Sequence, residues 1–102
     1  MIREINVDKL TENISSMCIE ANHILSEDMK CKLKEAVEKE ESQLGKKILN
    51  QLQENLKIAK EDQIPICQDT GMTVVFLEVG QDVHFTGGSV EDAVNEGVRQ
   101  GY

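Results

Sequence analysis

The first two-thirds of the chain repeats apolar residues at helical spacing. Three stretches show this pattern, residues 7–25, 27–40 and 43–62, with apolar side chains at steps of three and four. The stripes comprise Val7, Leu10, Ile14, Met17, Ala21 and Ile24, then Met29, Leu33, Ala36 and Val37, then Leu44, Ile48, Leu52, Leu56 and Ala59. Ser26 and Ser42 stand where helix N-caps are favoured. The pattern predicts three amphipathic helices with polar outer faces.

The pattern changes at Ile64 and Pro65. Proline lacks an amide hydrogen and disfavours helix at the residue before it. Residues 73–79, TVVFLEV, form a nearly continuous, β-branched apolar run, which is typical of a strand covered on both faces. A turn at 80–82 and a short return strand at 83–85 are expected to follow. This part of the chain therefore predicts a strand or a β-hairpin.

A last helix is predicted to begin after Ser89, because Asp92 three residues on resembles a capping box. Gly97 and Gly101, four residues apart, leave room for another element to approach the helix closely. The apolar and small-residue side of this helix predicts a packing partner. For that reason we expect the natural polypeptide to continue beyond Tyr102.

These elements predict an α+β fold, with three N-terminal helices followed by a strand or β-hairpin and a C-terminal helix. We expect a helical N-terminal section at 1–63 and a section of loop, strand and helix at 64–102, which together make one incomplete domain. A strand without sheet neighbours exposes apolar surface, so an oligomer is expected.

Charge and cysteine content narrow the function. The formal net charge is −8, so a nucleic-acid partner is not expected. Ten of the eleven basic residues lie in 1–63, which leaves Arg99 as the one basic residue from 64 onward. The N-terminus, MIREINVDKL, is charged early and lacks an apolar run, which predicts no membrane segment and a cytoplasmic location. Three cysteines in that compartment are expected to be thiols or metal ligands rather than disulfides.

The densest chemistry lies in the loop at 65–71, PICQDTG. It holds a soft ligand at Cys67, an amide at Gln68 and a carboxylate at Asp69, between a predicted helix and a predicted buried strand. Taken alone, such a loop favours a structural role over a metal site. The sequence therefore leaves both alternatives open at this point.

The remaining cysteines and histidines predict structural roles. Cys18 falls in the apolar stripe of the first helix, where a free cysteine acts as a small buried hydrophobe. Cys31 falls on the polar face of the second helix and is expected to be a solvated thiol. His23 lies near the end of the first helix, where a cation interacts well with the helix dipole. His84 is expected at a strand edge.

Four segments, IPICQDTGM, VFLEVGQDVHFTGG, AVNEGVRQGY and the helical lead-in KILNQLQENLKIAKEDQ, resemble the α subunits of iron–sulfur-dependent hydro-lyases, the class I fumarate hydratases and L-tartrate dehydratases. The resemblance implies a [4Fe-4S] cluster held by three protein cysteines, with one iron open to a C4 dicarboxylate such as fumarate, malate or tartrate. Cys67 matches a cluster ligand. Gln68 and Asp69 match substrate contacts, and Asp69 also matches a catalytic position in proton transfer.

The same resemblance implies that this chain is only part of the enzyme. The family's α subunit is longer, so the other two cluster cysteines and most cationic substrate contacts are expected from its remainder and from a β subunit or C-terminal β domain. On this reading the chain alone is inactive. The alternative is a non-enzymatic helical protein-interaction module. The two hypotheses differ on Cys67, because an interaction module tolerates Cys67→Ser and a cluster enzyme does not.

Overall fold

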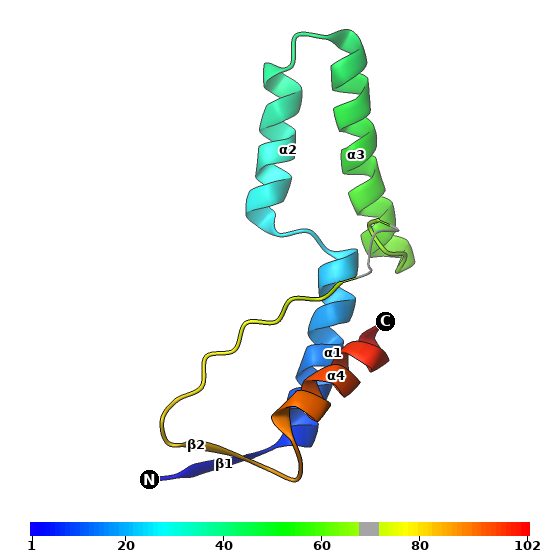
Figure 1. Cartoon of the computed structure of the whole chain (residues 1–102). Coiled ribbons are helices and arrows are strands. Elements are labelled where there is room, and N and C mark those ends of the chain that lie inside the picture. Colours follow the sequence, from blue (N-terminus) through cyan, green and yellow to red (C-terminus); the bar gives the residue numbers. More distant parts are fainter. Residues whose placement is uncertain (68–71) are drawn as a thin grey trace. The chain divides into compact units, whose positions relative to one another are not determined.

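The structure is a computed structural model that describes residues 1–67 and 72–102. Along the chain it contains β1 (Arg3–Asn6), α1 (Val7–His23), α2 (Glu27–Lys39), α3 (Gln43–Asp62), β2 (Val83–Thr86) and α4 (Val90–Gly101) (Figure 1). The predicted α+β class is confirmed, as are its three long helices followed by a strand and a C-terminal helix. The described residues form two compact units, one drawn from 1–20 and 72–102 and the other from 21–67.

The helix bounds agree with the apolar periodicity because polar caps fix where the helices begin. The Ser42 hydroxyl accepts a hydrogen bond from the Gly45 amide at 3.2 Å, and the Ser89 hydroxyl accepts one from the Asp92 amide at 3.4 Å. Ser26 occupies the N-cap position of α2 without a side-chain capping bond. Sequence reasoning missed one cap, the Asn6 side chain, which accepts from the Asp8 amide at 2.8 Å where α1 begins.

The first unit is held together by close packing of α4 on α1. A Cβ atom at Gly97 would lie 2.8 Å from Ile14 Cβ and 2.8 Å from the Thr11 carbonyl oxygen. One at Gly101 would lie 2.7 Å from Cys18 Cβ. Real side chains do not approach that closely, so only glycine permits this contact. The predicted close approach is confirmed, and its partner is a helix of this same chain.

A side-chain hydrogen bond reinforces the α1–α4 contact. The Thr11 hydroxyl donates to the Ala93 carbonyl oxygen at 2.9 Å, across 82 residues of sequence. Ala93 itself is buried. The apolar and small-residue side of α4 therefore faces α1, and it does not by itself require the longer polypeptide that the sequence suggested.

The buried face of α1 is narrower than the predicted stripe. Val7, Ile14 and Cys18 are buried, at helical steps of seven and four. Met17, which the stripe included, is 62% exposed, so that assignment was wrong. The physical reason is the glycine pair, because α4 meets α1 where Gly97 and the next glycine allow backbone approach rather than where the largest apolar side chain lies.

The two strands form a parallel pair rather than a hairpin. β1 and β2 run in register from Arg3 opposite Val83 to Asn6 opposite Thr86. The Arg3 amide donates to the Asp82 carbonyl oxygen at 2.7 Å. No apolar pattern indicated β1, because two of its four residues, Arg3 and Glu4, are charged. Its extended form depends on pairing with β2 from the other end of the chain.

The apolar run TVVFLEV is not a strand. Residues 72–80 have no regular secondary structure, and Phe76 is 91% exposed. A strand needs backbone hydrogen-bond partners, and among the described residues no segment pairs with this run. The Thr73 hydroxyl bonds to the Tyr102 hydroxyl at 3.0 Å, which ties one end of the run to the end of α4.

The second unit is built on α2 and α3, which run antiparallel and are joined by a short turn at 40–42 (Figure 1). Their bounds were predicted well, but their burial was not. No residue of α2 is buried, and Ala59 is the buried residue of α3. The exposed members of the predicted stripes include Met29, Leu44, Ile48 and Leu52. Two helices alone have too little facing surface to cover both apolar stripes.

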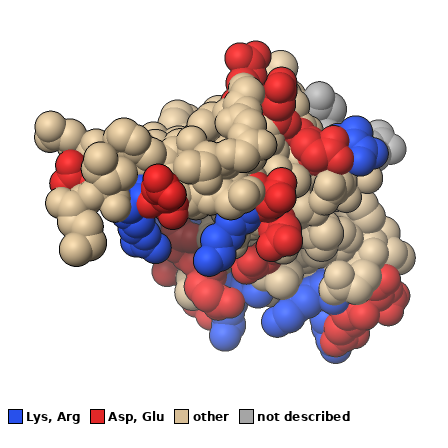
Figure 2. Space-filling view, turned by 90° about the horizontal axis from the view of Figure 1, so that it is seen from below, with Lys and Arg blue, Asp and Glu red and all other residues tan. Residues whose placement is uncertain are grey.

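The surface carries charges of both signs. In the view of Figure 2, acidic and basic side chains of the described residues are interspersed among uncharged areas. Within the described ranges, no helix combines the length and apolar character needed to cross a bilayer.

We predict that Gly97→Ala destabilises the first unit. The added methyl meets Ile14 and the Thr11 carbonyl, neither of which can move freely, so the free energy of unfolding should fall by about 1–3 kcal/mol. Urea denaturation followed by circular dichroism measures this loss.

Gly45→Ala is the matched control for Gly97→Ala. A Cβ at Gly45 meets only the flexible Glu40 side chain at 2.8 Å, and alanine favours a helix by roughly 0.5–1 kcal/mol over glycine. Its stability should be unchanged or slightly higher. Equal effects of the two substitutions would contradict the proposed role of Gly97.

Candidate functional site

The candidate site is the loop that follows α3. The helix ends at Gln63, which adopts the left-handed conformation with φ 54°, and the Ile64 amide donates back to the Ala59 carbonyl oxygen at 3.1 Å. This pairing is a Schellman-type helix end, which reverses the chain direction and is commonly followed by proline. Pro65 follows here. The helix end predicted from Ile64 and Pro65 is therefore confirmed.

The backbone just before Cys67 is anchored on both of its polar groups. The Ile66 amide donates to the Asn22 carbonyl oxygen in the last turn of α1 at 2.7 Å. The Ile66 carbonyl oxygen accepts from the Asn55 side-chain amide, on α3, at 2.9 Å. Both contacts lie inside the second unit. They position the residue that precedes the candidate thiolate.

The predicted site residues are only partly within the described structure. Cys67 is described and exposed, so its thiol is accessible to a ligand. Gln68 and Asp69 lie outside the described residues, and their roles stay predictions. Among residues 1–67 and 72–102, no three His, Cys, Asp or Glu side chains gather into a metal site. In the described part of the candidate loop, the soft ligand is Cys67.

The other two cysteines lie elsewhere, as the sequence predicted. Cys18 is buried in α1, and its Cβ lies against Gly101 of α4. Cys31 is exposed on α2 and lines a cavity between α2 and α3. Neither is part of the loop at Cys67, so neither adds a second ligand there.

The basic residue of the C-terminal section, Arg99, is engaged on its own helix. Its guanidinium donates to both carboxylate oxygens of Glu96, at 2.8 and 2.5 Å. Hydrogen bonds from Arg99, and then from Gln100, lower the pKa of the Glu96 carboxyl to about 2. Glu96 therefore stays ionised through neutral pH, and the pair persists there. Arg99 is thus an exposed residue on the surface of α4.

The histidines take the positions that the sequence indicated. His23 is the last residue of α1. His84 is exposed on β2, opposite Glu4 of β1 in the parallel register.

Asn22 and Asn55 are the site residues that sequence reasoning missed. Asn22 contributes its backbone carbonyl, which any residue type supplies, so its identity carried no signal. Asn55 contributes its side chain, whose partner is set only by the tertiary fold. The one available signal was weak. Asparagine is a poor helix former, so its presence inside α3 is compatible with a side chain that hydrogen-bonds outside the helix.

An exposed cysteine on an anchored loop is a residue that a soft metal can take as a ligand. Comparison with known proteins identifies the family of the chain. The family model for fumarate hydratase (Fumerase) matches residues 11–102, and the chain belongs to this family. No solved structure matches the chain significantly.

Two curated relatives are L(+)-tartrate dehydratase α subunits. The putative subunit α of Methanocaldococcus jannaschii is 38% identical over 93 residues, which cover 90% of this chain and 33% of the relative. The subunit α of Escherichia coli (strain K12) is 34% identical over 74 residues, covering 72% of this chain and 24% of the relative. The aligned part is therefore a third or less of these relatives.

We predict that Asn55→Ala loosens the backbone before Cys67. Loss of the hydrogen bond to the Ile66 carbonyl should speed amide hydrogen exchange at Ile66 by about two- to tenfold, the effect of one net hydrogen bond. Asn50→Ala, an exposed site on the same helix, is the control and should leave that exchange rate unchanged. Equal rates in wild type and Asn55→Ala would show that Asn55 does not anchor the loop.

Proposed function

We propose that this chain is the N-terminal part of the α subunit of a [4Fe-4S]-dependent hydro-lyase. The observation that carries the proposal is the family match across residues 11–102, within which an exposed Cys67 follows an anchored backbone. The reaction is the reversible addition or removal of water on a C4 dicarboxylate, either fumarate and malate or tartrate.

Cys67 is the residue of this chain that would hold the cluster. A thiolate is the ligand that iron–sulfur clusters take, and an exposed thiol on a fixed backbone suits that role. The donor set fits as one ligand of three, so the other two cysteines come from outside this chain. When bound, the cluster supplies a Lewis acid toward the substrate hydroxyl and carboxylate.

Gln68 and Asp69 are proposed to bind and orient the substrate. The Gln68 amide can donate to a carboxylate, and the Asp69 carboxylate can accept and return a proton, which makes Asp69 the proposed catalytic residue. A dicarboxylate also needs cationic contacts. Arg99 is already paired with Glu96, so those contacts are proposed to come from the rest of the enzyme.

The proposed partners follow from the relatives and from the exposed surface. The relatives are named subunit alpha, which supports a β subunit or C-terminal β domain as partner here. Val74 and Phe76 are exposed in the extended run, and such surface is normally covered in an assembly. We propose an oligomeric, cytoplasmic enzyme in which 1–63 is the helical section and 64–102 carries the cluster loop, both within one domain.

A non-enzymatic helical interaction module is the second candidate function. The observation that favours it is the apolar surface of α3, where Leu44, Ile48 and Leu52 are all exposed. A module of that kind makes no use of Cys67, so the cysteine experiment separates the two functions.

We predict that Cys67→Ser abolishes cluster binding in the complete enzyme. The complete α polypeptide and its β partner would be reconstituted with iron and sulfide under anaerobic conditions. Bound iron, cluster absorbance and fumarate or tartrate turnover would then be measured. All three should collapse, since serine is a poor ligand for such clusters.

Cys31→Ser is the matched control, because Cys31 is also an exposed cysteine of the second unit. It should retain wild-type iron content and turnover. If Cys67→Ser keeps both its cluster and its activity, the ligand assignment is wrong and the interaction module becomes the better hypothesis.

We also predict that the purified 102-residue chain is catalytically inactive. It provides one thiolate at the candidate loop, and its C-terminal cation is engaged with Glu96. Fumarate hydration and tartrate dehydration, followed by absorbance after anaerobic reconstitution, should stay at the background rate. Adding the missing polypeptides should restore turnover. Turnover by the chain alone would contradict the proposed incompleteness of the site.

A further inference from the structure

A cavity between α2 and α3 gathers four of the chain's nine lysines. It has a volume of about 690 Å³, within the range of small-molecule sites, about 300–1,000 Å³. Its lining residues are Glu27, Lys30, Cys31, Lys34, Gln53, Leu56, Lys57, Lys60 and Glu61. Four lysines against two glutamates make this lining cationic, in a chain whose net charge is −8. We refer to it as the lysine cavity.

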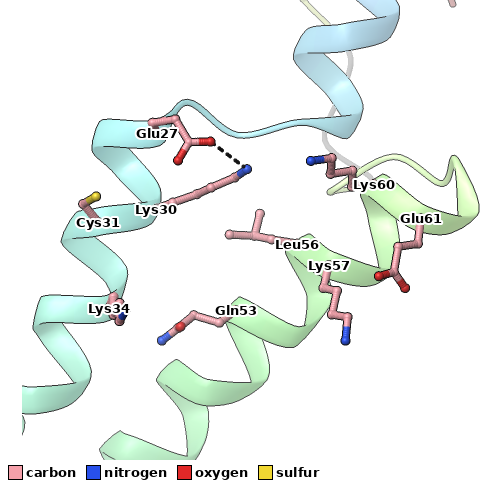
Figure 3. Close-up of a pocket in the computed structure, with 9 residues that line it drawn as sticks. All are labelled: Glu27, Lys30, Cys31, Lys34, Gln53, Leu56, Lys57, Lys60 and Glu61. Carbon is pink, nitrogen blue, oxygen red and sulfur yellow. Dashed lines mark hydrogen bonds and ion pairs between the residues drawn. The ribbon is translucent and has the colours of Figure 1, made fainter.

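Two of these cations face each other from opposite helices. Lys30 extends from α2 and Lys60 from α3, and their side chains point toward one another with Leu56 nearby (Figure 3). Like charges that converge repel each other, and the repulsion grows as water is withdrawn. An anion seated between the two ammonium groups would turn that repulsion into two attractions.

The two glutamates of the cavity do not neutralise the charges of Lys30 and Lys60. Glu27 accepts from Lys30 at 3.3 Å, but the glutamate side chain is itself 87% exposed, so the pair is a weak surface contact. Lys30, by contrast, has only 29% of its side chain exposed. Among the described residues Lys60 has no ion-pair partner, and Glu61 points away from Lys30 in Figure 3.

Lys30 is the most enclosed of the four lysines, since it is half-buried and the other three are exposed. Residues that face a partner helix are normally apolar, and Lys30 projects toward the partner helix near Leu56 (Figure 3). Lys60 is exposed, and its ammonium group is directed toward Lys30 across the cavity. An anion between them would therefore contact one half-buried and one exposed lysine.

We propose that the lysine cavity binds a small phosphate-bearing anion. The cationic groups are all lysines, which bind phosphate as point charges, whereas the planar guanidinium suited to bidentate carboxylate recognition is absent from the lining. Gln53 offers an amide and Leu56 an apolar surface to the rest of the ligand. This site is independent of the proposed function at Cys67, which does not line the cavity.

The test is titration of the 102-residue chain with inorganic pyrophosphate at low ionic strength, followed by calorimetry. Saturable binding that weakens as NaCl is added is expected, because exposed charges are screened by salt. Lys30→Gln/Lys60→Gln should weaken binding by about tenfold or more, the loss of two charge-assisted contacts. No saturable binding to wild type would overturn the proposal.

The control is Lys32→Gln/Lys47→Gln. This variant also removes two positive charges, one from α2 and one from α3. Like Lys30, Lys32 forms an ion pair with a glutamate three residues away, Glu35. Neither residue lines the cavity. Pyrophosphate affinity should remain that of wild type, with circular dichroism showing intact helices in both double variants. Equal loss in both would mean that only net charge is sensed, which overturns the site.

Two further arms use wild-type protein. Citrate, a carboxylate anion, tests which anion the cavity prefers. Citrate binding as tight as that of pyrophosphate would overturn the phosphate assignment.

Alkylation by N-ethylmaleimide, mapped by peptide mass spectrometry, tests where pyrophosphate binds. Pyrophosphate should slow modification of Cys31, which lines the cavity, without slowing that of Cys67. Equal protection of both cysteines, or of neither, would contradict binding in the cavity.

Discussion

The close contact between α1 and α4 is the constraint on which the first unit depends. Gly97 and Gly101 bring the backbones of the two helices together, and the Thr11 hydroxyl bonds across the contact to the Ala93 carbonyl. The β1–β2 pair is built from the segments that lead into these same helices. Few of the described residues are buried, so there is no large apolar core among them. The glycine contact is therefore what joins the helices at the two ends of this unit.

The second unit serves the candidate site in a different way. Its helices bury little apolar surface, but together with the last turn of α1 they fix the backbone before Cys67 through Asn22 and Asn55. A metal ligand is useful only if its position is set before the metal binds. Here hydrogen bonds to the backbone N–H and C=O of one residue, Ile66, rather than dense packing, provide that positioning. The family to which the chain belongs gives this thiol its proposed role.

The lysine cavity adds a second chemical feature to the same helices. The Cys67 loop offers a thiol to a metal, whereas the cavity offers lysine ammonium groups to an anion. The two sites would therefore bind different kinds of ligand. The packing between α2 and α3 is shallow, and Leu56 is only half-buried beside the cavity lysines.

The sequence by itself determined the helices, the break at Pro65, the burial of Cys18, the exposure of Cys31 and the family. These features follow from local periodicity, from capping residues and from a motif, all of which are read along the chain. The tertiary structure decided what depends on distant partners. β1 exists only through β2, the run at 73–79 is not a strand because no described segment pairs with it, and Met17 is exposed because Gly97 selects another face of α1. Asn55 likewise acquired its role only when folding brought it to the Ile66 carbonyl, because a hydrogen bond between residues eleven apart leaves no local pattern.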